Sequence, residues 1–261
     1  MPWENFPIII LSLLYGFIIG SFLNVCIYRL PRGESIIWPG SHCPICQHNL
    51  AWFDNIPLLS FIFLRGHCRY CYKLISWQYP IIELLNALLW VLAAFLNPHY
   101  PQLILQQLFI SALIVLSVID LKSMIIPDEV NLFIALLGLV SCFVYPEISW
   151  QDRLWGCLAG GGSLLLVGEL SFWILKVEGM GGGDIKFLAA AGLMLGWRNV
   201  ILVFFLSAFV ALPFIALNSL VGKKIQKHAT IPYGPSLAIA SLLALWWGET
   251  MIATYLGYFG V

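Results

Sequence analysis

Long apolar runs, separated by short polar segments, follow one another along most of this chain. A helix needs about 20 apolar residues to cross the hydrocarbon core of a bilayer. By this measure the predicted membrane spans lie near residues 7–28, 80–97, 102–120, 130–146, 154–175, 184–196, 200–221 and 235–258. The span at 184–196 is short for a crossing helix. The pattern therefore predicts an all-α polytopic membrane protein with about eight transmembrane helices.

The composition agrees with lipid as the main solvent. Only 10% of the 261 residues are charged, against about 25% in an average soluble domain, and the mean hydropathy is +0.90. The formal net charge is zero, so no nucleic-acid partner is expected. Residues 1–6 contain Glu4 and no Lys or Arg. Because a secretory signal peptide needs a basic start, the first apolar run is predicted to be a retained helix.

The basic residues predict the orientation of the helices. If the eight spans cross in turn, 11 of the 13 Lys and Arg residues fall on one side: Arg29, Arg32, Arg65, Arg69, Lys73, Lys122, Lys176, Lys186, Lys223, Lys224 and Lys227. The other side holds Arg153 and Arg198. Basic residues collect in the cytoplasmic loops of membrane proteins. Both termini are therefore predicted to lie outside the cytosol, and the long polar segment after the first span inside it.

This polar segment divides the chain into three parts. Residues 1–30 are predicted to form the first transmembrane helix, residues 31–79 a small cytosolic domain, and residues 80–261 a membrane-embedded domain of about seven helices. Residues 31–79 are too few to bury an apolar core that is stable by itself. Some cross-link is therefore expected within this domain.

Four cysteines supply a candidate cross-link. Cys43 and Cys46 form one Cys-x-x-Cys pair, Cys68 and Cys71 form another, and 21 residues separate the pairs. Two such turns complete the tetrahedron of a structural zinc site. Disulfides are disfavoured in the cytosol, although a redox pair remains an alternative. Four thiolates would close the coordination sphere, so the predicted zinc is structural rather than catalytic; His42 and His67, next to the pairs, are alternative ligands.

Two aspartates stand at the predicted cytosolic ends of different spans. Asp120 ends the apolar run 113–119, and Asp184 opens the apolar segment that follows it. Two carboxyl groups that share a site hold one proton between them. One carboxylate can then activate a water as general base while the other acts as general acid. Taken singly, Asp184 is better explained as a helix cap and Asp120 as an interfacial partner of Lys122.

Glycines cluster in two places. Gly181, Gly182 and Gly183 precede Asp184, and their bare backbone would admit an extended peptide substrate. The run 160–162 is also all glycine, but no strand precedes it, so it is predicted to be a helix-packing surface rather than a nucleotide-binding loop.

Several motifs, in the same order along the chain, resemble the type IV prepilin leader peptidase family of bacterial inner membranes. The resemblance is carried by Gly20-Ser-Phe-Leu-Asn-Val-Cys-Ile-Tyr-Arg-Leu-Pro31, Asn55-Ile-Pro57, Arg65-Gly-His-Cys-Arg-Tyr-Cys71, Ile75-Ser-Trp-Gln-Tyr-Pro80 with Glu83, Glu178-Gly-Met-Gly-Gly-Gly-Asp184-Ile-Lys186, and Ile231-Pro-Tyr-Gly-Pro235. The fifth of these resembles the GxGD motif shared with presenilin-type proteases. Two positions depart from the family pattern: Gly182, where a bulkier residue is common, and Trp77-Gln78, which replaces a basic residue.

The resemblance implies a membrane aspartyl endopeptidase with Asp120 and Asp184 as the catalytic pair. Its substrates would be prepilins and pilin-like secretion subunits, whose short basic leader is removed on the cytosolic side of the inner membrane. It also implies methylation of the new N-terminal amine with S-adenosylmethionine as the donor, for which Glu83 is the one residue that we can suggest. A cleavage-only enzyme and a transporter that uses the two aspartates as a proton relay are the alternatives. The sequence does not specify an oligomeric state.

Recognition of a basic leader calls for acidic residues on a face that is itself basic. The candidates at or near the predicted cytosolic face are Asp54, Asp128, Glu129 and Glu178. We expect these carboxylates to attract the leader.

Overall fold

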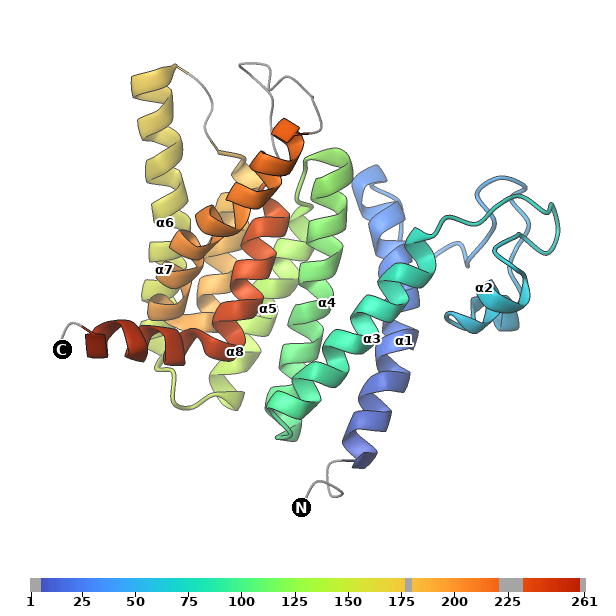
Figure 1. Ribbon diagram of the computed structural model, residues 1–261, viewed down its shortest axis with the longest axis horizontal. Coiled ribbons are helices and arrows are strands. Elements are labelled where there is room, and N and C mark those ends of the chain that lie inside the picture. The colour runs from blue at the N-terminus through green and yellow to red at the C-terminus, as the bar shows by residue number, and fades with distance from the viewer. Residues whose placement is uncertain (1–5, 177–179, 221–231, 259–261) are drawn as a thin grey trace. The chain divides into compact units, whose positions relative to one another are not determined.

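The computed structural model describes residues 6–176, 180–220 and 232–258. The predicted residues Glu178, Lys223, Lys224, Lys227 and Ile231 lie outside these ranges. The helices are α1 (Phe6–Arg29), α2 (Leu59–Phe63), α3 (Gln78–Leu96), α4 (Tyr100–Ser123), α5 (Asp128–Val144), α6 (Trp150–Leu175), α7 (Gly182–Leu220) and α8 (Gly234–Tyr258), with two 3-10 turns, η1 (Leu30–Arg32) and η2 (Trp52–Asn55). Within the described ranges every regular element is a helix (Figure 1), which confirms the predicted all-α class.

Six of these helices are long and apolar enough to cross a membrane: α1, α3, α4, α6, α7 and α8. The protein is therefore a multi-pass membrane protein, but the count of eight spans is not confirmed. Helix α5 has 17 residues and is shorter than a typical crossing helix. The predicted spans 184–196 and 200–221 fall in the single element α7, which has one residue with non-helical angles, Gly196 (φ 78°, ψ 169°).

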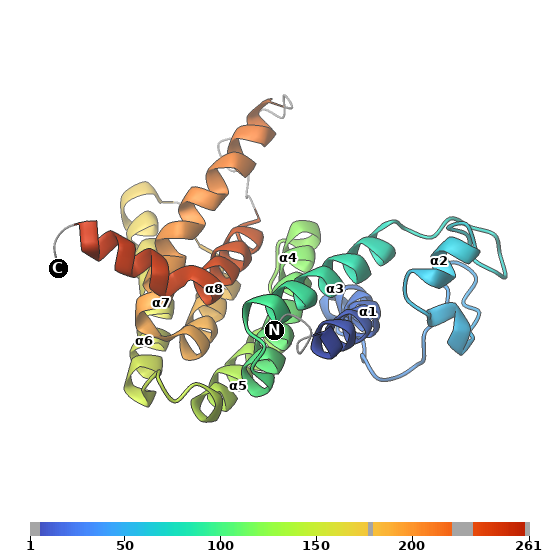
Figure 2. The same cartoon turned by 60° about the horizontal axis from the view of Figure 1, so that its bottom comes forward.

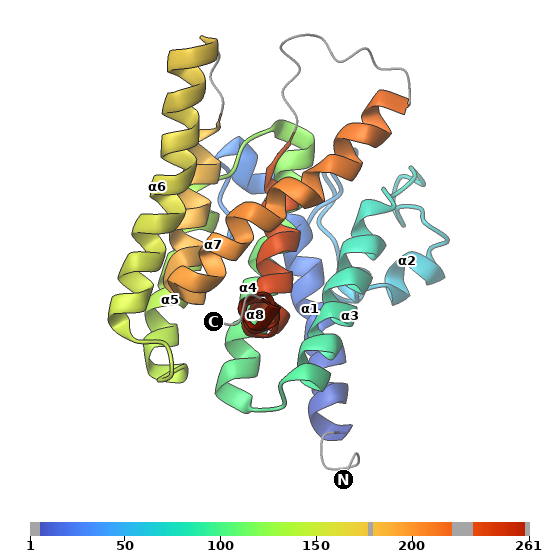
Figure 3. The same ribbon diagram turned by 60° about the vertical axis from the view of Figure 1, so that its left-hand side comes forward.

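The chain forms two compact units, Met1–Val115 and Leu116–Val261, with the boundary inside α4. The predicted division at residues 30 and 79 stays a prediction. In the first unit α1 and α3 lie side by side in all three views (Figures 1–3). Glycines allow this approach: a Cβ added at Gly16 would lie 2.6 Å from the Cα of Ala87, and one added at Gly20 would lie 2.7 Å from the Cα of Glu83. Such small residues, four apart, are a common membrane helix interface.

Helices α6 and α7 make the corresponding pair in the second unit (Figure 3). A Cβ at Gly156 would lie 2.4 Å from the carbonyl oxygen of Gly192, and one at Gly160 would lie 2.3 Å from that of Leu188. The prediction that glycines 160–162 form a packing surface is confirmed for Gly160 and Gly161, whereas Gly162 faces open space.

Arg153 compensates for the break in α7. The Gly196 backbone lies in a region open essentially to glycine alone, and it interrupts the helical hydrogen bonds of the preceding turn. The buried guanidinium of Arg153 donates to the carbonyl oxygens of Leu193 (3.0 Å) and Met194 (3.5 Å). It also donates to the carbonyls of Ser141 and Tyr145, both at 3.0 Å, where α5 ends. One cation thereby joins carbonyl groups at the end of α5 to carbonyl groups just before the break in α7.

Candidate active site and four-thiol cluster

The two Cys-x-x-Cys pairs fold into matching turns. In the first, the Gln47 N–H donates to the Cys43 carbonyl (2.8 Å), and in the second the Tyr72 N–H donates to the Cys68 carbonyl (3.0 Å). Gln47 and Tyr72 occupy equivalent positions and have nearly equal left-handed φ values, 58° and 57°. The chain therefore builds the same turn twice, as the sequence spacing predicts.

These turns bring the four thiols together. The Sγ atoms of Cys43, Cys46, Cys68 and Cys71 all lie within 4.8 Å of one another, and those of Cys43 and Cys71 are 3.9 Å apart. Zinc–sulfur bonds of about 2.3 Å in a tetrahedron place the sulfurs about 3.8 Å apart. The cluster therefore fits a zinc ion. His42 and His67 instead point a ring nitrogen at the carbonyl oxygens of Gly40 and Arg65.

The thiols influence one another's protonation. Burial of the Cys43 thiol opposes its ionisation, but hydrogen bonds from the backbone N–H groups of Cys46 and Ile45 outweigh burial and lower its pKa to about 7. The Cys71 thiol accepts a hydrogen bond from the backbone N–H of Lys73, but burial and the neighbouring thiols raise its pKa to about 11. Four thiols this close cannot all lose their protons unless a cation joins them, which is the condition that zinc would meet.

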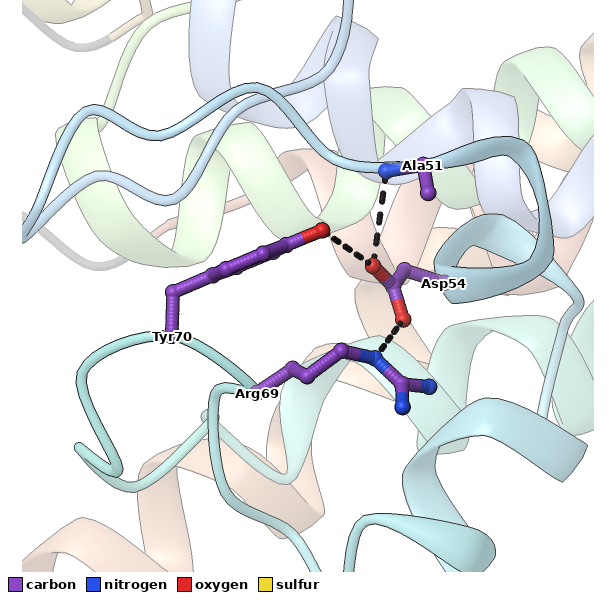
Figure 4. A network of polar contacts seen from close by, with 4 residues as sticks. All are labelled: Ala51, Asp54, Arg69 and Tyr70. Atoms are coloured by element: carbon purple, nitrogen blue, oxygen red, sulfur yellow. Dashed lines mark hydrogen bonds and ion pairs between the residues drawn. The ribbon is translucent and has the colours of Figure 1, made fainter.

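A polar network holds the two turns against each other. The Asp54 carboxylate accepts hydrogen bonds from Arg69 Nε (2.8 Å), the Tyr70 hydroxyl (3.3 Å) and the Ala51 N–H (3.4 Å) (Figure 4). The ring of His48, from the first turn, stacks on Tyr70 at 3.7 Å between centroids. The Asp54 side chain is 2% exposed, so it has a structural partner and is not free to attract a leader as we expected.

Glu83 also has a partner in the polar domain. This buried carboxylate on α3 accepts a hydrogen bond from the Leu58 N–H at 2.8 Å. Leu58 has a left-handed φ of 59°, an uncommon conformation for a non-glycine residue. Glu83 therefore positions the start of α2, and its suggested part in methyl transfer stays a prediction.

Asp120 lies near the end of α4 and meets the start of α8. Its side chain is buried (5% exposed), and its carboxylate accepts a hydrogen bond from the Gly234 N–H at 2.7 Å. A Cβ added at Gly234 would lie 2.8 Å from this carboxylate oxygen. The amide groups at a helix start have no partner within the helix and favour a negative charge. Glycine at this position therefore allows the helix start to reach the carboxylate.

Asp184 lies in the first turn of α7, and the segment between α4 and α5 packs against Gly183, just before it. A Cβ at Gly183 would lie 2.9 Å from the Cβ of Ile126, whereas Gly182 faces open space. Asn131 Nδ2 donates to the Gly183 carbonyl at 3.4 Å. Lys186 forms an exposed ion pair with Asp128 at 2.8 Å, so Asp128 too has a partner other than a leader.

The second unit brings the two aspartates together. Asp184 lies within electrostatic range of both Asp120 and Tyr233, and the Tyr233 hydroxyl is 2.6 Å from Ser207 Oγ. Gly234 thus contacts Asp120, and its neighbour Tyr233 lies within electrostatic range of Asp184. We did not predict this role from the sequence, where 114 residues separate Gly234 from Asp120; the motif ending at Pro235 was the available signal.

Comparisons with known proteins identify the family of this chain. Residues 14–96 match the bacterial peptidase A24 N-terminal domain, and residues 107–216 match the type IV leader peptidase family. The prepilin leader peptidase/N-methyltransferase of Aeromonas hydrophila is 36% identical, covering 99% of this chain and 96% of the relative. The chain belongs to the type IV leader peptidase family.

Relatives in this family span distant bacteria. The proteins of the same name from Bacillus subtilis and Pseudomonas aeruginosa are each 33% identical and cover 93% and 97% of this chain, and 96% and 94% of their own length. No solved structure matches the chain. The resemblance inferred from the sequence motifs is therefore confirmed.

Proposed function

We propose that this member of the family is a membrane aspartyl endopeptidase that removes the leader from prepilins and pilin-like subunits. Asp120 and Asp184 are its catalytic pair. The observation that carries the proposal is that the two carboxyl groups, on different helices, lie within electrostatic range of each other, while Asp120 is bonded to the start of α8. The names of the relatives supply the substrate class.

The chemistry needs one proton shared by the two carboxyl groups. The ionised carboxylate takes a proton from a water as the water oxygen attacks the scissile carbonyl carbon, and the protonated partner donates to the carbonyl oxygen. When the tetrahedral intermediate collapses, the carbon–nitrogen bond breaks and the leaving amine takes a proton from the pair. The two groups act as a unit. The Gly234 N–H would hold the Asp120 carboxylate in place during this cycle.

The glycines before Asp184 suit an extended substrate. Gly181 and Gly182 are exposed and Gly182 has open space around it, so a peptide strand can approach their backbone. Gly183 is packed against Ile126 and would instead fix the loop. Because Asp54 and Asp128 are engaged by Arg69 and Lys186, Glu129 is the remaining described acidic residue of those suggested to attract the basic leader.

We also propose that Cys43, Cys46, Cys68 and Cys71 bind a structural zinc ion that folds the cytosolic domain. The distances between the thiols support this proposal. With all four positions filled, the metal would have no open site for substrate. The distribution of Lys and Arg supports the placement of this domain in the cytosol and of both termini outside it, in the bacterial inner membrane.

Methylation of the new N-terminal amine is the second proposed activity, and the names of the relatives support it. S-adenosylmethionine would supply the methyl group. One oxygen of the Glu83 carboxylate accepts a hydrogen bond from the Leu58 N–H, and the part of Glu83 in methyl transfer stays a prediction.

Purified protein in detergent, with a prepilin and S-adenosylmethionine, tests the proposal when mass spectrometry separates leader loss from methylation. We expect both changes in mass without any ion gradient. Leader loss alone would leave the cleavage-only alternative, and no leader loss from a folded protein would contradict the peptidase proposal.

A further inference from the structure

An uncharged apolar segment lies inside the polar domain, at residues 56–64. It contains α2, whose Leu59, Ile62 and Phe63 are 51%, 58% and 80% exposed. Nine residues are too few to cross a bilayer. A cluster of large exposed apolar side chains of this kind usually marks an interaction surface.

Two contacts fix the level of α2 along α3. The hydrogen bond from the Leu58 N–H reaches Glu83, which lies five residues into α3 and thus about 7.5 Å below the start of that helix. The Phe61 ring packs against Trp77 at 5.0 Å between centroids. In Figures 1 and 3, α2 accordingly lies beside the first turns of α3 rather than beyond the end of α1.

The surroundings of α2 match the membrane interface. Helices α1 and α3, which flank the domain, are both long and apolar enough to span a membrane, and a segment beside the first turns of such a helix falls where head groups meet acyl chains. Trp77, at the start of α3, is 70% exposed, and tryptophan is enriched at this depth. Arg65 is exposed one residue after Leu64. The domain as a whole has the basic residues Arg32, Arg65, Arg69 and Lys73 and the acidic residues Glu34 and Asp54.

We propose that α2 is a membrane-surface anchor. Leu59, Ile62 and Phe63 insert among the acyl chains of the leaflet in which α3 begins, and Arg65 reaches the phosphates of the head groups. The anchor holds the four-thiol cluster close to the bilayer. This inference rests on the membrane spans and the contacts of α2, and it does not depend on the peptidase activity.

The depth of α2 and the net charge of the domain favour lipid over protein as the occupant of this surface. A segment held at the level of the second turn of a membrane span meets the bilayer on any side that protein does not cover. The excess of basic residues complements the anionic head groups of a cytoplasmic leaflet. A substrate helix or a second copy of this chain would be the alternative occupant, and the experiment distinguishes them.

Photo-crosslinking in intact membranes tests the anchor. p-Benzoylphenylalanine replaces Phe63 in the full chain, or Tyr72 as the control, which is 78% exposed on the second cysteine turn. After illumination, mass spectrometry identifies what is joined to residue 63 or 72. We expect phospholipid adducts at residue 63 and none at residue 72. Adducts at 63 mainly with a prepilin or a second copy, no adduct at 63, or equal lipid adducts at both positions would overturn the proposal.

Variants at residue 83 test what sets the depth. Glu83→Gln keeps an oxygen that accepts from Leu58, whereas Glu83→Leu lacks any acceptor. The lipid adduct at residue 63 should persist with glutamine and be lost with leucine. Equal adducts in the two variants would overturn the part assigned to Glu83.

Discussion

The four-thiol domain and the aspartate site are assembled in opposite ways. The thiols come from two short turns of similar sequence, each closed by its own backbone hydrogen bonds. The aspartates come from separate long helices and meet through packing at Gly183 and Gly234. On the proposed function, a metal would hold the first arrangement together. The second is built by helix packing and should stand without metal.

The two regions are therefore expected to depend on different sources of stability, metal binding in one and helix packing in the other. The cysteine domain should respond to chelators and thiol substitutions, and the aspartate site to changes in side-chain volume where helices touch. The following predictions test that division, from the largest expected effect to the smallest.

Removal of one thiol should abolish metal binding. We expect Cys46→Ser to lose its zinc, because structural zinc contributes about 10–16 kcal/mol of apparent free energy in small zinc-finger peptides. Metal content per protein and proteolysis within residues 31–79 measure the effect. Cys142→Ser, an exposed cysteine on α5, is the control and should keep its zinc. If both variants keep the helical content of wild type, the helices do not depend on the metal, as we expect. A large loss of helical content in Cys46→Ser would contradict this independence.

A methyl group at residue 234 should disturb the aspartate site and spare the zinc. The Cβ of Gly234→Ala would lie 2.8 Å from a carboxylate oxygen of Asp120 and would push the start of α8 away. A misplacement near 1 Å can cost about 10²-fold in rate, so we expect a fall of that order in kcat/KM for leader removal. Gly257→Ala on the same helix meets nothing within 4 Å and should cleave normally. Equal activity of the two variants would contradict the role of Gly234.

The hydrogen bond from Asn131 to the Gly183 carbonyl should have a smaller effect. Because a neutral hydrogen bond contributes about 0.5–1.5 kcal/mol, Asn131→Ala should lower kcat/KM by up to about tenfold. Asn199→Ala is the matched control: this buried asparagine bonds to Glu249 at 3.3 Å, in the part of α7 beyond Gly196. It should alter thermal stability without altering kcat/KM, and the opposite pattern would count against the role of Asn131.

The exposed ion pair should have the smallest effect. Lys186 and Asp128 are 58% and 71% exposed, and pairs of this kind contribute about 0–1 kcal/mol. Lys186→Met should lower the melting temperature slightly in low salt, and the difference from wild type should shrink in high salt. A large loss that does not depend on salt would mean that the pair has a further role.

Local patterns in the sequence predicted much of the fold. Apolar runs located the membrane helices, because lipid demands them, and the spacing of Cys43, Cys46, Cys68 and Cys71 predicted their cluster. The number of spans did not follow, since hydropathy cannot distinguish two short helices from one helix interrupted at Gly196. Arg153, assigned to the side opposite the cytosol, is buried among carbonyl groups, a role that only the three-dimensional break in α7 creates.

The sequence predicted the two acidic residues of the candidate site but not the residues that hold them in place. Asp120 and Asp184 stood out as charges beside apolar runs. Gly234 and Asn131 act through contacts between residues far apart in sequence, and no periodicity encodes such contacts. Asp54 was expected to face substrate, but the arginine and tyrosine beside Cys68 and Cys71 enclose it.

The most direct test of the account replaces each aspartate by asparagine, which keeps the size but cannot share the proton. Asp120→Asn and Asp184→Asn would be purified beside Asp152→Asn, a partly exposed aspartate in the first turn of α6, and assayed for leader removal and bound zinc. We predict that the first two variants release no leader while keeping a full complement of zinc, and that Asp152→Asn cleaves like wild type. Leader removal by a folded, zinc-loaded Asp120→Asn or Asp184→Asn variant would contradict the aspartyl mechanism.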